Sequence, residues 1–175
     1  AQCRPMQPAR PDCFVALLGT KGGPAIYPGG PLPTASLLCL GGETIVVDCG
    51  AGVAAGIARQ GVDLKSITMI FITHLHSDHC GGNALLQVAF PNARTLTPPG
   101  LAPSIREWDP IALTYTPTGQ SCPPFKLSDV LRDGEHFKVS GRRWEVHAAP
   151  GHDPHSVVLF CPAERILISA DALWE

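Results

Sequence analysis

The sequence lacks the features of a membrane-spanning or disulfide-stapled chain. No run of 18 apolar residues occurs, which argues against a transmembrane helix. None of the seven cysteines forms a Cys-x-x-Cys pair, and their odd number and irregular spacing argue against a disulfide framework. We therefore expect free thiols and a cytoplasmic location. Because the chain begins at Ala1 rather than Met, a secreted or periplasmic location stays open.

An excess of charge of one sign is also missing. Lys and Arg total 13, Asp and Glu total 15, and the formal net charge is −2. The basic residues form no stripe, so we do not expect nucleic acid as a partner and favour a small-molecule substrate. A Gly-x-Ser-x-Gly elbow is absent, which leaves a serine-hydrolase mechanism without support. The hydrophobic share of 45% is that of an ordinary globular domain.

Apolar runs alternate with short helical patterns and many turns. We expect a loose N-terminal arm over residues 1–13 and one α/β domain over 14–175, in which 18 glycines and 18 prolines put much of the chain into loops. The predicted helices are 51–60, 83–90 and 101–108, and 19–33 and 98–124 are predicted loops. The predicted strands are 14–18, 35–40, 44–47, 67–73, 93–97, 137–139, 143–148, 156–161 and 165–170.

The segment Thr73-His-Leu-His-Ser-Asp-His79 carries the clearest chemical signal. It follows a predicted buried strand and places three imidazoles and a carboxylate within six residues. These groups are common zinc ligands, and His74 and His76 alternate along an extended chain, so they project to one side. Asp78 and His79 follow where the chain bends. We expect His74, His76, Asp78 and His79 to face two adjacent metal positions.

Three more residues occupy the ends of predicted strands. His152 follows Pro150-Gly151, and Asp171 ends the predicted buried strand that begins at residue 165. A carboxylate at the end of a buried strand is costly unless it is paired or bound to metal, so we expect Asp171 to be a metal ligand. Asp48 ends the strand 44–47, and we expect it to orient the ligand segment without binding metal itself.

Together these residues resemble the metallo-β-lactamase superfamily, through His74-x-His76-x-Asp78-His79, Gly151-His152 and Asp171. The resemblance implies an αβ/βα sandwich of two mixed sheets with a dinuclear metal site at one edge. It assigns His74, His76 and His152 to a first metal, Asp78 and His79 to a second, and Asp171 to both. Zinc is the family's usual metal, and the same ligands also suit iron or manganese. His136 and His147 match no motif and are expected to be ordinary surface or strand histidines.

Two departures from the family pattern matter. Members usually supply a further histidine to the second metal, well after the bridging aspartate, and this chain ends at Glu175. We therefore expect the second half of the fold to be incomplete and a homo-oligomer to be one way of completing it. The opening, around LLGTKGGP and VVDCG, resembles the branch with phosphodiesterases and ribonuclease Z. The later APGHDPHSVVLF resembles the glyoxalase II-like branch.

These observations favour a metal-dependent hydrolase in which metal-activated hydroxide attacks a small ester, lactone, thioester or β-lactam. Asp78 is the candidate catalytic residue, because it can also orient the hydroxide or handle its proton. A phosphodiesterase or ribonuclease Z-like nuclease is the first alternative. A non-catalytic, metal-binding domain that self-associates is the second.

Overall fold

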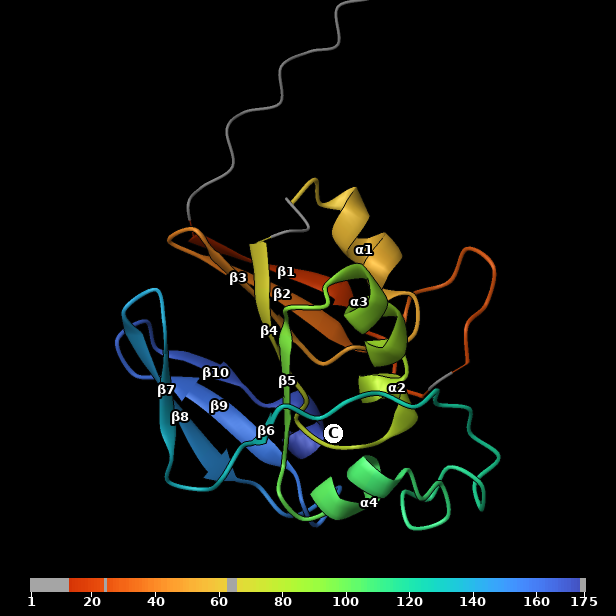
Figure 1. Ribbon diagram of the computed structural model, residues 1–175. Coiled ribbons are helices and arrows are strands. Elements are labelled where there is room, and N and C mark those ends of the chain that lie inside the picture. The colour runs from red at the N-terminus through yellow and green to blue at the C-terminus, as the bar shows by residue number, and fades with distance from the viewer. Residues whose placement is uncertain (1–12, 24, 63–65, 174–175) are drawn as a thin grey trace, which may run out of the picture.

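The computed structural model describes residues 13–23, 25–62 and 66–173 (Figure 1). Residues 1–12 of the predicted arm lie outside the described residues, and Cys13, its last residue, is the first residue of a strand. The strands are β1 (Cys13–Gly19), β2 (Ala35–Leu40), β3 (Glu43–Val47), β4 (Ile67–Phe71), β5 (Arg94–Thr97), β6 (Asp129–Val130), β7 (His136–Val139), β8 (Arg142–Ala148), β9 (Val157–Cys161) and β10 (Ile166–Ile168). The helices are α1 (Val53–Arg59), α2 (Ser77–Cys80), α3 (Asn83–Ala89) and α4 (Ala102–Glu107), with a 3₁₀ turn at Ala170–Ala172.

The first sheet is mixed and has the order β1-β2-β3-β4-β5-β6. Its first three strands pair antiparallel, and β3 to β6 pair parallel. Parallel neighbours need crossover connections, and α1, α3 and α4 lie in those connections. Gly41-Gly42, both with positive φ, turn the β2–β3 hairpin as the sequence predicts.

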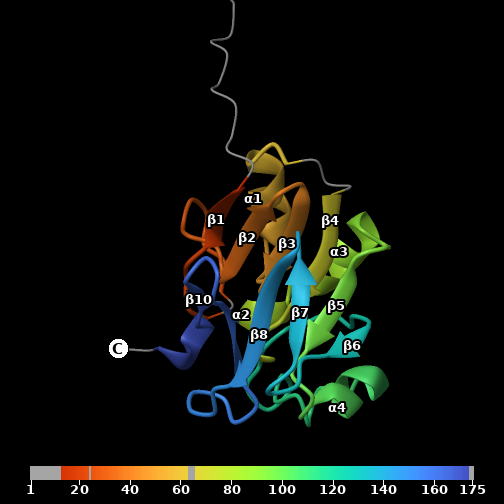
Figure 2. The ribbon, with the colours of Figure 1, turned by 90° about the vertical axis from the view of Figure 1, so that its left-hand side faces the viewer.

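The second sheet has the order β10-β9-β8-β7, and its described strands pair antiparallel throughout. Figure 2 shows it stacked against one face of the first sheet, while α1 and α3 cover the opposite face. The described residues thus form a layer of helices, a mixed sheet and an antiparallel sheet (Figures 1 and 2). This is the two-sheet α/β sandwich that the family resemblance implies, although the described strands of the second sheet pair antiparallel and are not mixed.

Two hydrophobic cores separate these layers, and the central strands supply both. Leu37 packs in the core under the helices, while its neighbour Leu38 packs in the core between the sheets. In the same way, Ile70 packs in the core under the helices and Phe71 packs in the core between the sheets. Successive side chains of a strand point to opposite faces, so a strand covered on both sides must be apolar throughout. This explains the uninterrupted apolar runs in the sequence.

The predicted elements agree with the structure within a few residues, with differences at three places. The short strand β6 and the single turn α2 were not predicted, because neither has enough residues to show a period. Of the predicted strand 165–170, only Ile166–Ile168 form a strand, β10. This strand is half-buried rather than buried, because β9 is its single neighbour among the described strands. Asp171 consequently lies in the 3₁₀ turn that follows, not at a buried strand tip. No helix in the described part of the chain is long and apolar enough to cross a membrane.

Candidate metal centre

The site lies where several strand ends meet at one edge of the sandwich. Asp48 directly follows β3, and the segment from His74 to His79 runs from the end of β4 into α2. His152 lies in the β8–β9 connection, and Asp171 follows β10. Each sheet therefore brings ligand candidates to the same place from distant parts of the chain.

Three histidines converge on one point. His74 Nε2 lies 3.2 Å from His76 Nδ1, and His76 Nδ1 lies 3.1 Å from His152 Nε2. Zinc binds imidazole nitrogen at about 2.0–2.1 Å, so two nitrogens of a tetrahedral site should be about 3.3–3.4 Å apart. His76 Nδ1 is thus close to a zinc-site spacing from each of the other two nitrogens, and all three ligand atoms lie within 4.8 Å of one another. His74, His76 and His152 are one of two groups in the described chain that could hold a metal.

The second such group consists of His74, His79 and Asp171. Asp171 Oδ2 lies 3.3 Å from His79 Nε2 and 3.6 Å from His152 Nε2, so this one oxygen sits between the two groups. His79 Nε2 is buried and has no hydrogen-bond partner of good geometry among the described residues. A buried imidazole nitrogen whose polar neighbours are carboxylate oxygens is well suited to hold a proton or a metal cation.

The Asp78 carboxylate faces the site from a slightly different direction. Its Oδ2 lies 3.9 Å from His79 Nε2 and accepts a hydrogen bond of 2.6 Å from the backbone N–H of Gly23. Asp78 is therefore next to the second group without belonging to it. The contact also ties the 19–33 loop to the ligand segment.

Asp48 holds the ligand segment from behind. Its carboxylate accepts hydrogen bonds from the backbone N–H of Thr73 at 2.8 Å and from the Thr73 hydroxyl, and its Oδ2 lies 2.8 Å from His79 Nδ1. Asp48 adopts φ 57°, a left-handed conformation that Asp tolerates and that often occurs at functional sites. The contact between Asp48 and His79 Nδ1 turns the other ring nitrogen, Nε2, toward Asp171. This is the contact that a ligand-orienting residue makes.

Burial and charge set the protonation of the histidines. Burial is the largest cause that lowers the pKa of His74 to about 4, and burial also lowers the pKa of His76. Both are therefore neutral at pH 7, with a lone pair available to a metal. Burial also acts to lower the pKa of His79, but Asp48 and Asp171 outweigh it and raise that pKa to about 10. The contact with His79 in turn lowers the pKa of Asp171.

A cavity of about 460 Å³ opens beside these groups. It is lined by His76, Asp78, His152 and Asp171. It is also lined by Gly22 and Gly23 and, from the loop after α4, by Thr114, Thr118 and Gln120, and we call these five residues the rim. Gln120 Oε1 accepts hydrogen bonds from the backbone N–H and hydroxyl of Ser77, which fixes this loop to α2. The cavity is large enough for a small organic molecule next to the candidate ligands.

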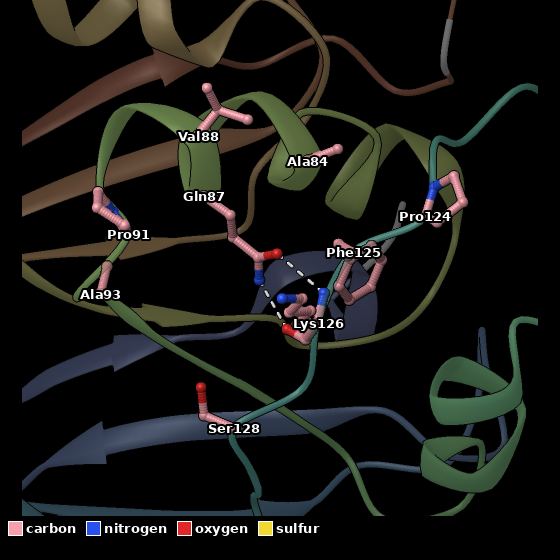
Figure 3. A pocket seen from close by; sticks show the side chains of 9 residues that line it. All are labelled: Ala84, Gln87, Val88, Pro91, Ala93, Pro124, Phe125, Lys126 and Ser128. Carbon is pink, nitrogen blue, oxygen red and sulfur yellow. Dashed lines mark hydrogen bonds between the residues drawn. The ribbon is translucent and has the colours of Figure 1, made fainter.

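A larger cavity, of about 570 Å³, lies between α3 and residues 124–128 (Figure 3). Gln87 crosses it and bonds the backbone of Lys126 in both directions. Its lining contains no His, Cys, Asp or Glu. This cavity is larger than the one beside the metal-ligand candidates, but its described lining carries no such candidates.

Sequence reasoning missed several residues that shape the site. Thr73 and Asp153 are adjacent to ligand candidates, and their positions beside His74 and His152 could have suggested them. Gly23 lies in the LLGTKGGP motif, which could have pointed to it, whereas Tyr115 and Gln120 carry no sequence signal because they reach the site only through the folded loop. The Tyr115 hydroxyl donates a 2.8 Å hydrogen bond to the Leu75 carbonyl, inside the ligand segment.

Glycine is required where the ligand segment turns into α3. The Gly82 N–H donates a 2.7 Å hydrogen bond to the Cys49 carbonyl. A Cβ at Gly82 would lie 2.5 Å from the Gly50 oxygen and 2.9 Å from the Cys49 oxygen. Only glycine allows the two backbones to approach this closely.

Comparison with curated proteins gives two kinds of relative. A hydroxyacylglutathione hydrolase from Stenotrophomonas maltophilia is 32% identical over 134 residues, which are 76% of this chain and 42% of that protein. A ribonuclease Z from Mycolicibacterium gilvum is 42% identical over 71 residues, which are 37% of this chain and 22% of that protein. The chain thus spans less than half the length of either relative.

Solved structures share the fold. A metallo-β-lactamase from Cronobacter sakazakii, a motif mutant, matches 87% of this chain and 58% of its own with a TM-score of 0.68 at 22% identity. A metallo-β-lactamase family protein from Thermus thermophilus matches 92% of this chain and 60% of its own with a TM-score of 0.68 at 24% identity. The family model described as the metallo-beta-lactamase superfamily matches residues 29–175. By fold, by motif and by this match, the chain belongs to the metallo-β-lactamase superfamily.

Proposed function

We propose that the protein is a zinc-dependent hydrolase that cleaves a small acyl compound, with a thioester as the first candidate. The convergence of the His74, His76 and His152 nitrogens at 3.1–3.2 Å carries this proposal, because it is the spacing of a zinc site. We assign the first metal position to these histidines. We assign the second to Asp78 and His79, with Asp171 between the two.

A zinc ion held by these residues would supply a Lewis acid and would lower the pKa of water toward about 7. The chain's own residues arrange the reaction around it. Asp48 holds the His79 ring in one orientation, and the Gly23 N–H fixes the Asp78 carboxylate at the cavity wall. From that wall Asp78 can take the proton of the attacking water. Thr114 and Gln120 at the rim lie where the substrate's remaining atoms would enter.

The thioester is favoured because the relative named hydroxyacylglutathione hydrolase aligns with 76% of the chain. The near-neutral charge of this chain also suits a small substrate. A ribonuclease Z-like phosphodiesterase is the second candidate. It rests on identities of 42–43% to ribonucleases Z over 67–71 residues, and a steep fall of RNA affinity with salt would favour it.

The test measures the zinc content of the protein and its hydrolysis of a hydroxyacylglutathione. Hydrolysis is detected through the free thiol that it releases. We expect the purified protein to contain zinc and to cleave the thioester. The His76→Ala variant should lose most of its zinc and its turnover. The His147→Ala variant is the matched control, because His147 is an exposed histidine whose ring contacts Glu145.

Other outcomes separate the alternatives. Zinc binding with cleavage of bis-p-nitrophenyl phosphate but not of the thioester would indicate the phosphodiesterase. Zinc binding without hydrolysis of either, in a self-associated protein, would indicate the non-catalytic domain. Equal turnover in His76→Ala and the parent protein would contradict the proposal.

A further inference from the structure

Two cysteines outside the proposed metal ligands have their sulfur atoms in contact. Cys80 Sγ, at the end of α2, lies 3.7 Å from Cys122 Sγ, in the loop after α4. They are two of the six free cysteines in the described chain. Cys80 is buried and Cys122 is partly exposed. One thiol is thus protected and the other can be reached from solvent.

We propose that Cys80 and Cys122 are a redox modification site, at which a reversible disulfide fastens the loop of residues 109–122 to the metal-binding segment. The inference does not rest on the proposed hydrolase activity, since it concerns only the two thiols and the loop. The disulfide would covalently attach a loop whose Thr114, Thr118 and Gln120 line the rim of the cavity.

Cys122 is the sulfur that a hydroperoxide reaches first. Its pKa is lowered because the Cys80 thiol hydrogen-bonds to it, although partial burial acts in the opposite direction. The thiolate attacks the peroxide, which becomes hydroxide or alkoxide, and Cys122 becomes a sulfenic acid. The Cys80 thiol then displaces the sulfenic hydroxyl. The S–S bond forms, one water leaves, and two electrons have passed from the thiols to the peroxide.

The geometry permits closure with a small movement. A disulfide needs an S–S distance of about 2.05 Å, so the sulfurs must approach by about 1.7 Å. Cys80 belongs to a fixed segment, because the Cys49 N–H donates to the His79 carbonyl at 2.6 Å and the Gly81 N–H to the Ser77 carbonyl at 2.8 Å. Cys122 lies outside any helix or strand. The loop, not α2, should therefore move.

Two contacts already hold the loop in the required place. The Tyr115 hydroxyl lies 3.0 Å from Cys80 Sγ and donates to the Leu75 carbonyl, and Gln120 is bonded to Ser77. These contacts reduce the entropy that the disulfide must overcome, because the loop is positioned before the sulfurs meet. The same contacts place the reducible bond next to the proposed metal ligands, where closing it would restrict the rim.

The test is peptide mapping after treatment with hydrogen peroxide, alkylation and tryptic digestion. Cys80 is alone in the expected peptide 66–94 and Cys122 is alone in 107–126. We expect a cross-linked species of these two peptides, lighter than their sum by about 2 Da, which dithiothreitol abolishes. We also expect protease cleavage within 109–122 to be slowed at least ~10-fold by oxidation.

The matched variants are Cys122→Ser and Cys39→Ser, which both replace a partly buried thiol. Cys122→Ser should abolish the cross-link and the protease protection, and Cys39→Ser should retain both. The proposal is wrong if both cysteines remain fully alkylated after oxidation. It is also wrong if 107–126 is joined to 22–59 through Cys49, or if Cys122 stops at sulfinic acid. The mapping uses the parent protein, so it remains decisive even where a variant folds poorly.

Discussion

The two sheets contribute to the metal centre in opposite ways. The six-stranded sheet supplies His79 and Asp48, whose side chains are 0% and 2% exposed and hydrogen-bonded to each other. The four-stranded sheet supplies His152 and Asp171, which are 35% and 17% exposed and come from a loop and a 3₁₀ turn. Asp48 and His79 thus form a buried frame, while His152 and Asp171, together with His76 at 35% exposed, close the site from the surface.

This difference indicates that folding and metal binding depend on different residues. Removing a buried member of a hydrogen-bonded pair leaves its partner unsatisfied, so it costs stability whether or not metal is bound. Removing an exposed ligand costs little until the metal must bind. The predictions below test this division, beginning with the largest effect.

We expect Asp48→Ala to lower the free energy of unfolding by about 3–5 kcal/mol, because it leaves the His79 ring and the Thr73 N–H buried without their acceptor. Urea unfolding of the metal-free protein measures this. Asp48→Asn should lose less, since it keeps an acceptor oxygen for Thr73. A loss below about 1 kcal/mol for the alanine variant would mean that the contacts of Asp48 with His79 and Thr73 do not stabilise the fold.

We expect His152→Ala to weaken zinc binding at least about 100-fold, because a ligand should matter no less than the residues that orient it. Its free energy of unfolding without metal should change by less than about 1 kcal/mol. Competition with a coloured chelator and urea unfolding give the two quantities. His147→Ala is the control for both. If the metal-free His152→Ala variant unfolds readily, the residues of the second sheet also stabilise the fold, and the proposed difference between the two sheets is wrong.

The stability of the metal-free protein should fall as the pH rises. Because the pKa of His79 is raised to about 10, from 6.5, its protonated form stabilises the folded state fully below pH 6.5. This contribution is lost as the pH rises from 6.5 through 10, so we expect a decrease of about 2.5 kcal/mol between pH 7 and 9. Unfolding midpoints across this range measure it. Asp48→Asn should flatten the dependence, and an equally steep slope in that variant would contradict the assignment to His79.

Most of the first half of the site could be predicted from the sequence. His74 to His79 lie within one short segment after an apolar strand, so their proximity follows from chain connectivity alone. The link to His152 and Asp171 required the family pattern, because 73 residues separate His79 from His152. Asp171 shows the limit of local reasoning: an apolar run indicates a strand but not whether a second strand covers it.

The amino-acid sequence by itself determined the types of ligand, their order and the apolar strands that carry them, since these depend on residue identity and short spacing. Only the tertiary structure decided which nitrogens converge, that the Asp78 carboxylate meets Gly23, and that Cys80 meets Cys122 across 42 residues. Contacts between distant segments depend on how the sheets stack and where the loops cross. No local period in the chain encodes that information.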